Sequence, residues 1–424
     1  MRYVYSALFY LLLPLLVLRM LLRSRRAPAY RQRLGERFGF FHCPQELTRG
    51  KVIWVHAVSV GETLAAAPMV ARLLADWPDH RLVITTTTPT GSERVQALFG
   101  DSVFHVYAPW DLPGAVSRFL RKVRPALLVI METELWPNML HYSHRADCRI
   151  VLANARMSAR SARGYARFGR LTSGMFSSLN AVACQSPADG ERLLALGLPP
   201  AKLHPTGSIK FDIEIDDALR KEATSLRHAL QDRPVLLGSS THQGEDELIL
   251  DAFTAAREQV PGLLCLLVPR HPERFDSVYQ LCLSRGLSTA RRSAAQLAGP
   301  EHAVLLGDTM GELRLLSGVA SLCVIGGSFI EHGGQNVLEA AAWGVPVISG
   351  PHMFNFSEIT ELLLQSGGMI QLAGAAELAP AVTRLLTDEP QRVAMGTAAA
   401  AVVENNRGAL DRLLALLASE LPGS

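Results

Sequence analysis

The sequence predicts an α/β protein of two doubly wound domains, each with a parallel sheet covered by helices on both faces. Short apolar runs alternate with segments of helical periodicity, which is the pattern of β-α-β units. This alternation stops once, near residue 210, and then starts again. A chain of 424 residues is long enough to build two such domains with their own cores.

The first half of the chain contains five apolar runs that we predict to be strands. They occupy residues 51–58, 81–88, 126–132, 149–156 and 179–186. Segments 61–77 and 111–124 between them have helical periodicity. Parallel strands joined by helices bring their carboxyl ends to one edge of the sheet, and ligands bind at that edge.

A polar, turn-rich stretch, 203–217, separates this set from a second one. The second set of predicted strands occupies residues 233–241, 262–269, 303–308, 320–328 and 345–350, with a predicted helix at 245–259. We therefore expect domains at 31–212 and 213–424, with the functional site in the cleft between them. The amphipathic stretch 410–421 either packs back on the first domain or contacts a membrane.

The N-terminal residues 1–30 predict a membrane anchor with a basic collar. Residues 4–18 carry no charge, and the arginines that follow, up to residue 37, are accompanied by a single acid, Glu36. By the positive-inside rule, positive charge after the apolar run predicts that the domains stay on the cytoplasmic side of the membrane. Because the run is short and contains Pro14, a helix lying on the bilayer stays as an alternative to one that spans it.

Composition excludes some functional classes. The net charge of +3 gives no support for a nucleic-acid binder. The six cysteines are scattered singly, which suits a reducing compartment and matches neither a zinc site nor a disulfide framework. GxxxxGK[ST], HExxH and GxSxG motifs are absent, and we expect no metal site.

Three charged side chains of the first half are candidates for catalysis. Glu62 follows the strand 51–58 at the start of a helix, where the helix dipole favours the ionised carboxylate that a base requires; the alternative is a helix cap. Glu132, with Glu134, ends another strand at the same sheet edge; the alternative is a loop with acidic surface residues. Lys210 lies at the domain junction, where a lysine suits neutralisation of a leaving phosphate, although an ordinary linker lysine is the alternative.

The second half contains the strongest local signal, in residues 324–351. A strand runs into Gly326 and Gly327, and a second pair, Gly333 and Gly334, is predicted to open a helix that carries Glu339. Backbone N–H groups at such a helix start bind anions, and an acid one turn later accepts bonds from ribose hydroxyls. Arg270, at the end of strand 262–269, suits bidentate contact with phosphate.

Seven segments, taken together and in order, resemble the 3-deoxy-D-manno-octulosonic acid (Kdo) transferases, membrane-anchored enzymes that add Kdo to the lipid A precursor. The segments are HAVSVGE, METELWPN, GSIKFD, GSSTHQGEDE, LVPRHPERF, GDTMGEL and GGQNVLEAAAWGVPVISGP. The resemblance covers nearly the whole chain, and no motif residue departs from the family pattern.

This resemblance implies a GT-B fold, with the lipid acceptor on the first domain and CMP-Kdo on the second. By motif, Glu62 matches the catalytic base, and Glu132 and Lys210 match residues that stabilise the transition state. The positions that match CMP-contacting segments are Pro269, Arg270, Met310, Gly311, Glu312, Asn336, Val337, Leu338 and Glu339.

The implied reaction is inverting transfer of Kdo from CMP-Kdo to the glucosamine 6'-hydroxyl of the tetraacylated lipid A precursor, lipid IVA. The number of Kdo units added stays open. No cofactor is expected, and the expected partners are CMP-Kdo, the lipid A precursor and an anionic phospholipid surface. Two alternatives stay open: a GT-B transferase that uses a UDP-sugar, and a membrane-tethered protein that binds a nucleotide sugar without turnover.

Overall fold

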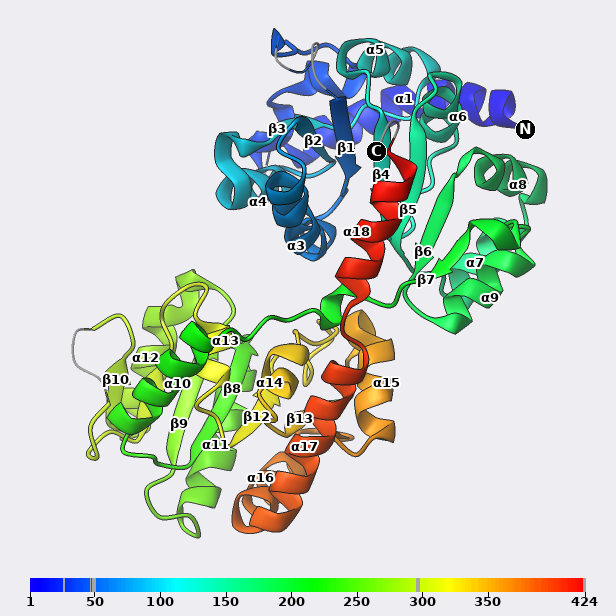
Figure 1. Ribbon diagram of the computed structural model, residues 1–424. Helices are drawn as coiled ribbons and strands as arrows, with labels where there is room; N and C mark the ends of the chain where they lie inside the picture. The colour runs from blue at the N-terminus through cyan, green and yellow to red at the C-terminus, as the bar shows by residue number, and fades with distance from the viewer. Residues whose placement is uncertain (26, 46, 48–50, 295–297, 422–424) are drawn as a thin grey trace. The chain divides into compact units, whose positions relative to one another are not determined.

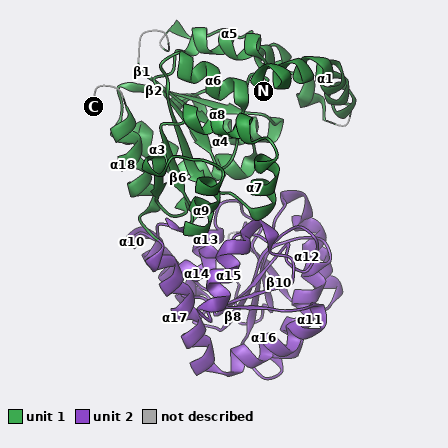
Figure 2. Ribbon diagram, turned by 90° about the vertical axis from the view of Figure 1, so that its right-hand side faces the viewer, with its two compact units in different colours: residues 1–210, 407–424 green, residues 211–406 purple. Residues whose placement is uncertain are grey.

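The computed structural model describes residues 1–25, 27–45, 47, 51–294 and 298–421, and the chain forms two compact units (Figure 2). Unit 1 consists of residues 1–210 and 407–424, and unit 2 of residues 211–406. The last helix, α18 (Ala409–Glu420), therefore belongs to unit 1, which is one of the two placements that the sequence left open.

Unit 1 contains a seven-stranded parallel sheet in the order β3-β2-β1-β4-β5-β6-β7 (Figure 1). Its strands are β1 (Lys51–His56), β2 (His80–Thr86), β3 (Phe104–Tyr107), β4 (Leu127–Met131), β5 (Arg149–Ala155), β6 (Ala181–Cys184) and β7 (Leu203–Pro205). The strand order reverses between β1 and β4, so the carboxyl ends of these two strands form the switch point at which doubly wound sheets bind ligands.

Two helical layers bury the two faces of this sheet. Alternate residues of β1 point to opposite faces, so that Val52 and Trp54 join one core and Ile53 and Val55 the other. The helices of unit 1 are α1 (Arg2–Arg23), α3 (Val60–Asp76), α4 (Pro89–Phe99), α5 (Pro113–Val123), α6 (Pro137–Arg145), α7 (Ala159–Ala166), α8 (Gly169–Ser178), α9 (Pro187–Ala195) and α18. Because β1 and β4 are covered on both faces, their sequences are almost uniformly apolar.

The helix α1 has 22 residues and is, by length and composition, apolar enough to cross a membrane. Its first turns contact α6, where Asn138 Oδ1 accepts hydrogen bonds from Arg2 Nη1 at 3.0 Å and from Ser6 Oγ at 3.1 Å. After its end, Arg31 Nε in the short helix η1 (Pro28–Arg31) donates to Ser24 Oγ at 2.7 Å.

The chain then returns to the globular part of unit 1 through η2 (Leu34–Phe38). The carboxylate of Glu36 accepts the N–H of Tyr107 at 2.8 Å, and the carbonyl of Arg37 accepts the N–H of Trp110 at 2.7 Å. Both ends of α1 are therefore fastened to the same unit.

Unit 2 has a second seven-stranded parallel sheet, in the order β10-β11-β9-β8-β12-β13-β14. Its strands are β8 (Val235–Thr241), β9 (Leu264–Pro269), β10 (Thr289–Arg291), β11 (Val304–Leu306), β12 (Leu322–Ile325), β13 (Val347–Ser349) and β14 (Met369–Gln371). The strand order reverses between β8 and β12, which places a second switch point at their carboxyl ends.

The helices of unit 2 also divide between the two faces of its sheet, as the two separate cores of this unit show. They are α10 (Asp217–Ala229), α11 (Glu245–Arg257), α12 (Phe275–Ser284), α13 (Leu313–Ser317), α14 (Leu338–Ala342), α15 (Ser357–Gln365), α16 (Leu378–Thr387) and α17 (Glu389–Asn405).

The predicted doubly wound fold is confirmed, and each predicted strand overlaps an observed one. Four short strands, β3, β7, β10 and β14, were missed because they have three or four residues and mixed polar sequences. The helix after the second glycine pair was placed too early. It begins at Leu338, four residues beyond Gly334.

Candidate functional site

Glu62 lies in the first turn of α3, directly after β1, and is only 8% exposed to solvent. The hydroxyl of the N-cap residue Ser59 accepts the N–H of Glu62 at 3.3 Å and donates to Oε1 at 3.0 Å. Glu62 Oε2 accepts the N–H of Val58 at 2.8 Å. The stretch is thus a variant of the capping box, and the helix-cap alternative describes its geometry correctly. The two bonds fix the carboxylate and leave each oxygen a further lone pair.

Burial raises the pKa of Glu62 to about 7, although the N–H of Val58 favours the ionised form. The negative charges of Glu134 and Glu132 contribute to this rise. The helix start was expected to favour the ionised form, but the net shift of this pKa is upward, because burial is its largest cause. A carboxyl group that titrates near neutral pH is well matched to accepting a proton there.

Glu132 follows β4 at the same switch point, in the left-handed backbone region with φ 55°. A residue other than glycine costs free energy there, and such positions cluster at functional sites. Its N–H donates to the carbonyl of Ala153 at 2.9 Å, and its Oε1 lies 3.6 Å from Lys210 Nζ. The structure thus brings together three charged side chains that are far apart in the sequence: Glu62, Glu132 and Lys210.

Asn154, which the sequence analysis did not single out, holds the segment that carries Lys210. It is fully buried near the end of β5 and also has a left-handed backbone, with φ 52°. Its Oδ1 accepts the N–H of Ile209 at 3.2 Å, and its carbonyl accepts Gln185 Nε2 at 2.8 Å. The sequence signal was an asparagine within the last residues of an apolar strand, a residue type that tolerates this conformation.

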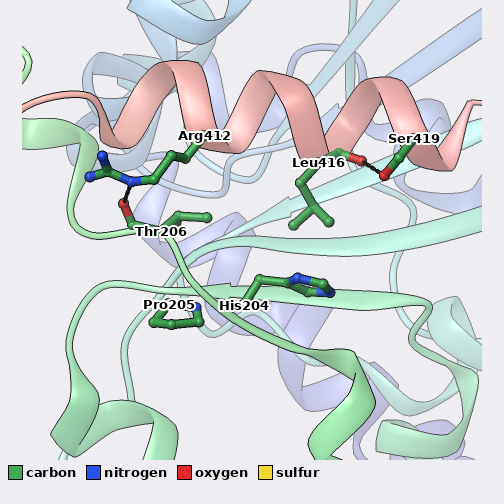
Figure 3. A pocket seen from close by; sticks show the side chains of 6 residues that line it. All are labelled: His204, Pro205, Thr206, Arg412, Leu416 and Ser419. Carbon is green, nitrogen blue, oxygen red and sulfur yellow. Dashed lines mark hydrogen bonds between the residues drawn. The ribbon is translucent and has the colours of Figure 1, made fainter.

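The helix α18 supports the same segment from another side. Arg412 Nε donates to the carbonyl of Thr206 at 2.8 Å (Figure 3). Gly207, with φ +88°, faces the side chains of Ala409 and Arg412. A hollow between β7 and α18 is lined by His204, Pro205, Thr206, Arg412, Leu416 and Ser419. None of the candidate catalytic residues lines it.

Glu134 lies near Glu62 and is connected to two aromatic side chains, Trp136 and His56. Burial raises the pKa of Glu134; a hydrogen bond from Trp136 Nε1 at 2.9 Å opposes this effect. The ring of His56 meets Trp136 edge to face at 4.6 Å. Burial lowers the pKa of His56 to about 3, so His56 is neutral at pH 7 and contributes packing here, not charge.

At the switch point of unit 2, the buried carboxylate of Glu245 connects the loops that follow β8 and β12. It accepts the N–H of His242 from the first loop. It also accepts three successive N–H groups of the second loop, from Gly327 at 2.6 Å and from Ser328 and Phe329 at 3.0 Å each. Glu245 therefore fixes the backbone of the loop that begins with the first glycine pair. The sequence analysis did not identify Glu245 as a site residue.

The predicted nucleotide-contacting residues lie at or beyond the carboxyl ends of β9, β11 and β12 of this sheet. Arg270 follows β9, and its N–H donates to the carbonyl of Thr241 at 2.9 Å. Burial raises the pKa of Glu339, and the positive charges of Arg314 and Arg270 oppose this effect. Among the described residues, Glu339 Oε2 is buried without a hydrogen-bond partner, which leaves it as an acceptor for a ligand hydroxyl.

The remaining predicted contacts differ in what they offer a ligand. Val337 and Leu338 are fully buried in the core, so only their backbone atoms are available. Met310 is 56% exposed and Gly311 has φ +87°. Glu312 pairs with Arg292 Nη2 at 2.8 Å and also accepts the hydroxyl of Thr309. Within the described ranges, no three His, Cys, Asp or Glu side chains gather as a metal site would require.

Comparison with known proteins finds matching families for both halves of the chain. A family model described as 3-deoxy-D-manno-octulosonic-acid transferase (kdotransferase) matches residues 32–213, and one described as glycosyl transferases group 1 matches residues 247–402. The 3-deoxy-D-manno-octulosonic acid transferase of Haemophilus influenzae is 44% identical over 421 residues, which cover 98% of each chain. That of Bordetella pertussis is 36% identical over 423 residues, covering 97% of this chain and 98% of the relative.

Solved structures resemble this chain in fold. Anabaena HepE in complex with UDP superposes with a TM-score of 0.56 at 14% identity, covering 88% of this chain and all of that one. A UDP-GlcNAc 2-epimerase from Neisseria meningitidis gives a TM-score of 0.58, also at 14% identity, with coverage of 87% and 100%. At this identity the likeness concerns the fold alone, which is GT-B.

Proposed function

Because this chain belongs to the family of 3-deoxy-D-manno-octulosonic acid transferases, glycosyltransferases of lipopolysaccharide biosynthesis, we propose that it transfers Kdo from CMP-Kdo to the 6'-hydroxyl of lipid IVA. The observation that carries this proposal is the gathering of Glu62, Glu132 and Lys210 at the switch point of unit 1. This group provides a proton acceptor with a pKa near 7 beside a fixed ion pair.

In the proposed step, the acceptor hydroxyl oxygen attacks the anomeric carbon of Kdo and its proton passes to Glu62. The bond from that carbon to the phosphate oxygen breaks, and its electron pair leaves with CMP. A single displacement of this kind inverts the anomeric configuration. General-base catalysis contributes about 10²–10⁴ in rate, and the fixed carboxylate of Glu62 is suited to that role.

Lys210 supplies positive charge and Glu132 fixes its ammonium at 3.6 Å, a pairing that suits stabilisation of charge in the transition state. CMP departs as a stable phosphate anion, so the scheme requires neither a strong acid nor a cofactor. We assign CMP binding to the residues around the switch point of unit 2. Arg270 faces the phosphate, and the unpartnered oxygen of Glu339 accepts ribose hydroxyls.

Competition between nucleotides separates this function from the UDP-sugar alternative. CMP is expected to displace a fluorescent cytidine nucleotide from the full-length protein at concentrations at least about tenfold lower than UMP or UDP. Equal or stronger displacement by UDP would instead favour a UDP-sugar donor.

We also propose that α1 lies along the cytoplasmic surface of the inner membrane and does not cross it. A helix of 22 residues is about 33 Å long, comparable to the hydrocarbon thickness of about 30 Å. A spanning helix would carry Arg2 to the far side of the bilayer, away from its partner Asn138. With Arg2 on Asn138, spanning would force the arginine-rich residues 23–33 back through the bilayer.

An apolar stripe along α1 supports this placement. Residues that are at least partly covered by the protein recur every three or four positions, from Arg2 and Tyr5 to Met20. The exposed large apolar side chains of the helix are Tyr3, Val4, Leu8, Tyr10, Leu11, Leu12, Leu15, Leu18, Leu21 and Leu22. Such a stripe, followed by exposed arginines, suits the acyl chains and anionic headgroups of one leaflet.

Thiol labelling tests this orientation. In a Cys43→Ser background, a cysteine inserted between Met1 and Arg2, before the apolar stripe begins, is expected to react with a membrane-impermeant maleimide in inverted inner-membrane vesicles and not in right-side-out spheroplasts. The variant Glu93→Cys, on the exposed surface of α4, reports the cytoplasmic side as a matched control. Labelling of this inserted cysteine in spheroplasts would show that α1 spans the bilayer.

A further inference from the structure

The segment 156–170, which follows β5, contains five arginines and no acid. It includes the whole of α7 and the start of α8. No Asp or Glu occurs between Asp147 and Asp189, so the positive charge is not balanced locally. Arg160, Arg163, Arg167 and Arg170 are exposed, and within the part of the chain that the structure describes their guanidinium groups make no hydrogen bond or ion pair.

Three of these arginines share one face of α7. Arg160, Arg163 and Arg167 follow the i, i+3, i+7 spacing, which aligns side chains along a helix. Ala162 and Tyr165, on the opposite face, pack against the core of unit 1. The helix therefore presents a row of guanidinium groups to the outside, and Phe168, which is 56% exposed, lies just beyond it.

This arginine face is attached directly to the loop of the proposed catalytic residue Glu132. The hydroxyl of Thr133 donates to the carbonyl of Arg156, and Tyr165 Oη donates to the carbonyl of Thr133 at 3.4 Å. Asp189 Oδ1 accepts the N–H of Met157 at 2.7 Å, which fixes the start of the segment from the side of α9. A group held by these arginines is thus held in a fixed relation to Glu132.

We propose that Arg160, Arg163 and Arg167 bind a phosphate group of the glycolipid acceptor and so position its reacting hydroxyl. Guanidinium groups match the geometry of phosphate with paired hydrogen bonds, and a row without acidic partners favours a ligand with several negative charges. The exposed ring of Phe168 offers an apolar contact beside them for the lipid part. This inference rests on the proposed function, because that function supplies a lipid acceptor with phosphates.

The test compares acceptors with and without phosphate on the full-length protein in neutral detergent micelles. For the triple variant Arg160→Gln, Arg163→Gln, Arg167→Gln, the KM for the bisphosphorylated acceptor is expected to rise at least about tenfold. The KM for CMP-Kdo should change less than about twofold. With the dephosphorylated acceptor, wild type and variant should differ little, since the interaction is already lost.

A charge-matched control removes three arginines elsewhere on unit 1: Arg121→Gln, Arg124→Gln, Arg145→Gln. It should leave the KM for the acceptor nearly unchanged. The phosphate groups of membrane phospholipids offer the same chemistry. The proposal would be overturned if the triple variant raised the KM for the acceptor only in vesicles with anionic phospholipid and not in neutral micelles. It would also be overturned if the KM rose equally for the phosphorylated and the dephosphorylated acceptor. Absence of transfer by the wild-type protein would instead contradict the proposed function itself.

Discussion

Replacing Glu62 with Gln is expected to lower kcat at least about a hundredfold while the Kd for CMP changes less than about twofold. The amide oxygen of Gln can still accept the N–H of Val58, so the helix start is retained while the basic oxygen is lost. Steady-state kinetics with CMP-Kdo and calorimetric titration with CMP measure the two quantities separately.

Two controls separate the base from the helix cap. Glu93→Gln, an exposed position on α4, should have no effect on kcat. Glu62→Ala removes both roles. Below about pH 4.5, where the buried carboxyl is uncharged and costs nothing, this variant should have a lower Tm than wild type through the loss of the capping bonds, which contribute about 1 kcal/mol. If Glu62→Gln retained wild-type turnover, Glu62 would be a cap and not the base.

Because the pKa of Glu62 is raised, the difference in Tm between Glu62→Gln and wild type should depend on pH. The pKa is about 7 in the fold and 4.5 ordinarily, so the buried carboxylate destabilises the fold fully above pH 7 and this cost disappears below about pH 4.5. Glu62→Gln should therefore have a higher Tm than wild type at pH 8, with a difference that shrinks toward pH 5. Wild-type kcat should fall as the pH drops below 7, because the base becomes protonated.

Replacing Arg270 with Ala is expected to raise the Kd for CMP about 10- to 100-fold, because a charge-assisted contact with phosphate contributes about 1.5–3 kcal/mol. Arg270→Lys retains the positive charge but cannot make the paired hydrogen bonds of a guanidinium group. Its Kd for CMP should lie between those of wild type and Arg270→Ala. Titration calorimetry with CMP gives each value, and Arg384→Ala, on the exposed surface of α16, is the matched control.

The two variants should divide the roles of the units. Glu62→Gln should spare CMP binding and Arg270→Ala should weaken it. Comparable losses of CMP affinity in both variants would contradict this division between a base in unit 1 and a nucleotide site in unit 2.

The sequence predicted the doubly wound fold because central parallel strands such as β1 and β4 are buried on both faces and need continuous apolar runs. It could not give the edge strands, because β7 (Leu203–Pro205) and β10 (Thr289–Arg291) depend on a neighbouring strand more than on their own residues. It left the place of α18 open, since an amphipathic helix of this kind suits several apolar surfaces.

The sequence predicted some residues of the candidate site and missed others, for a physical reason. Glu62 and Glu132 follow strands, so topology alone places them at one sheet edge. Asn154 and Glu245 act through hydrogen bonds to residues 55 and more than 80 positions away, and no local pattern encodes those pairs. The sign of the pKa shift at Glu62 also depends on burial, which only the folded chain determines.

The most direct test of the account is mass spectrometry of the tetraacylated lipid A precursor after incubation with CMP-Kdo and the full-length protein in neutral detergent. The account predicts an acceptor heavier by one or more Kdo units with wild type, the increment giving the number added, and almost none with Glu62→Gln in the same time. An unchanged acceptor mass with wild-type protein that still binds CMP would contradict Kdo transfer to this lipid.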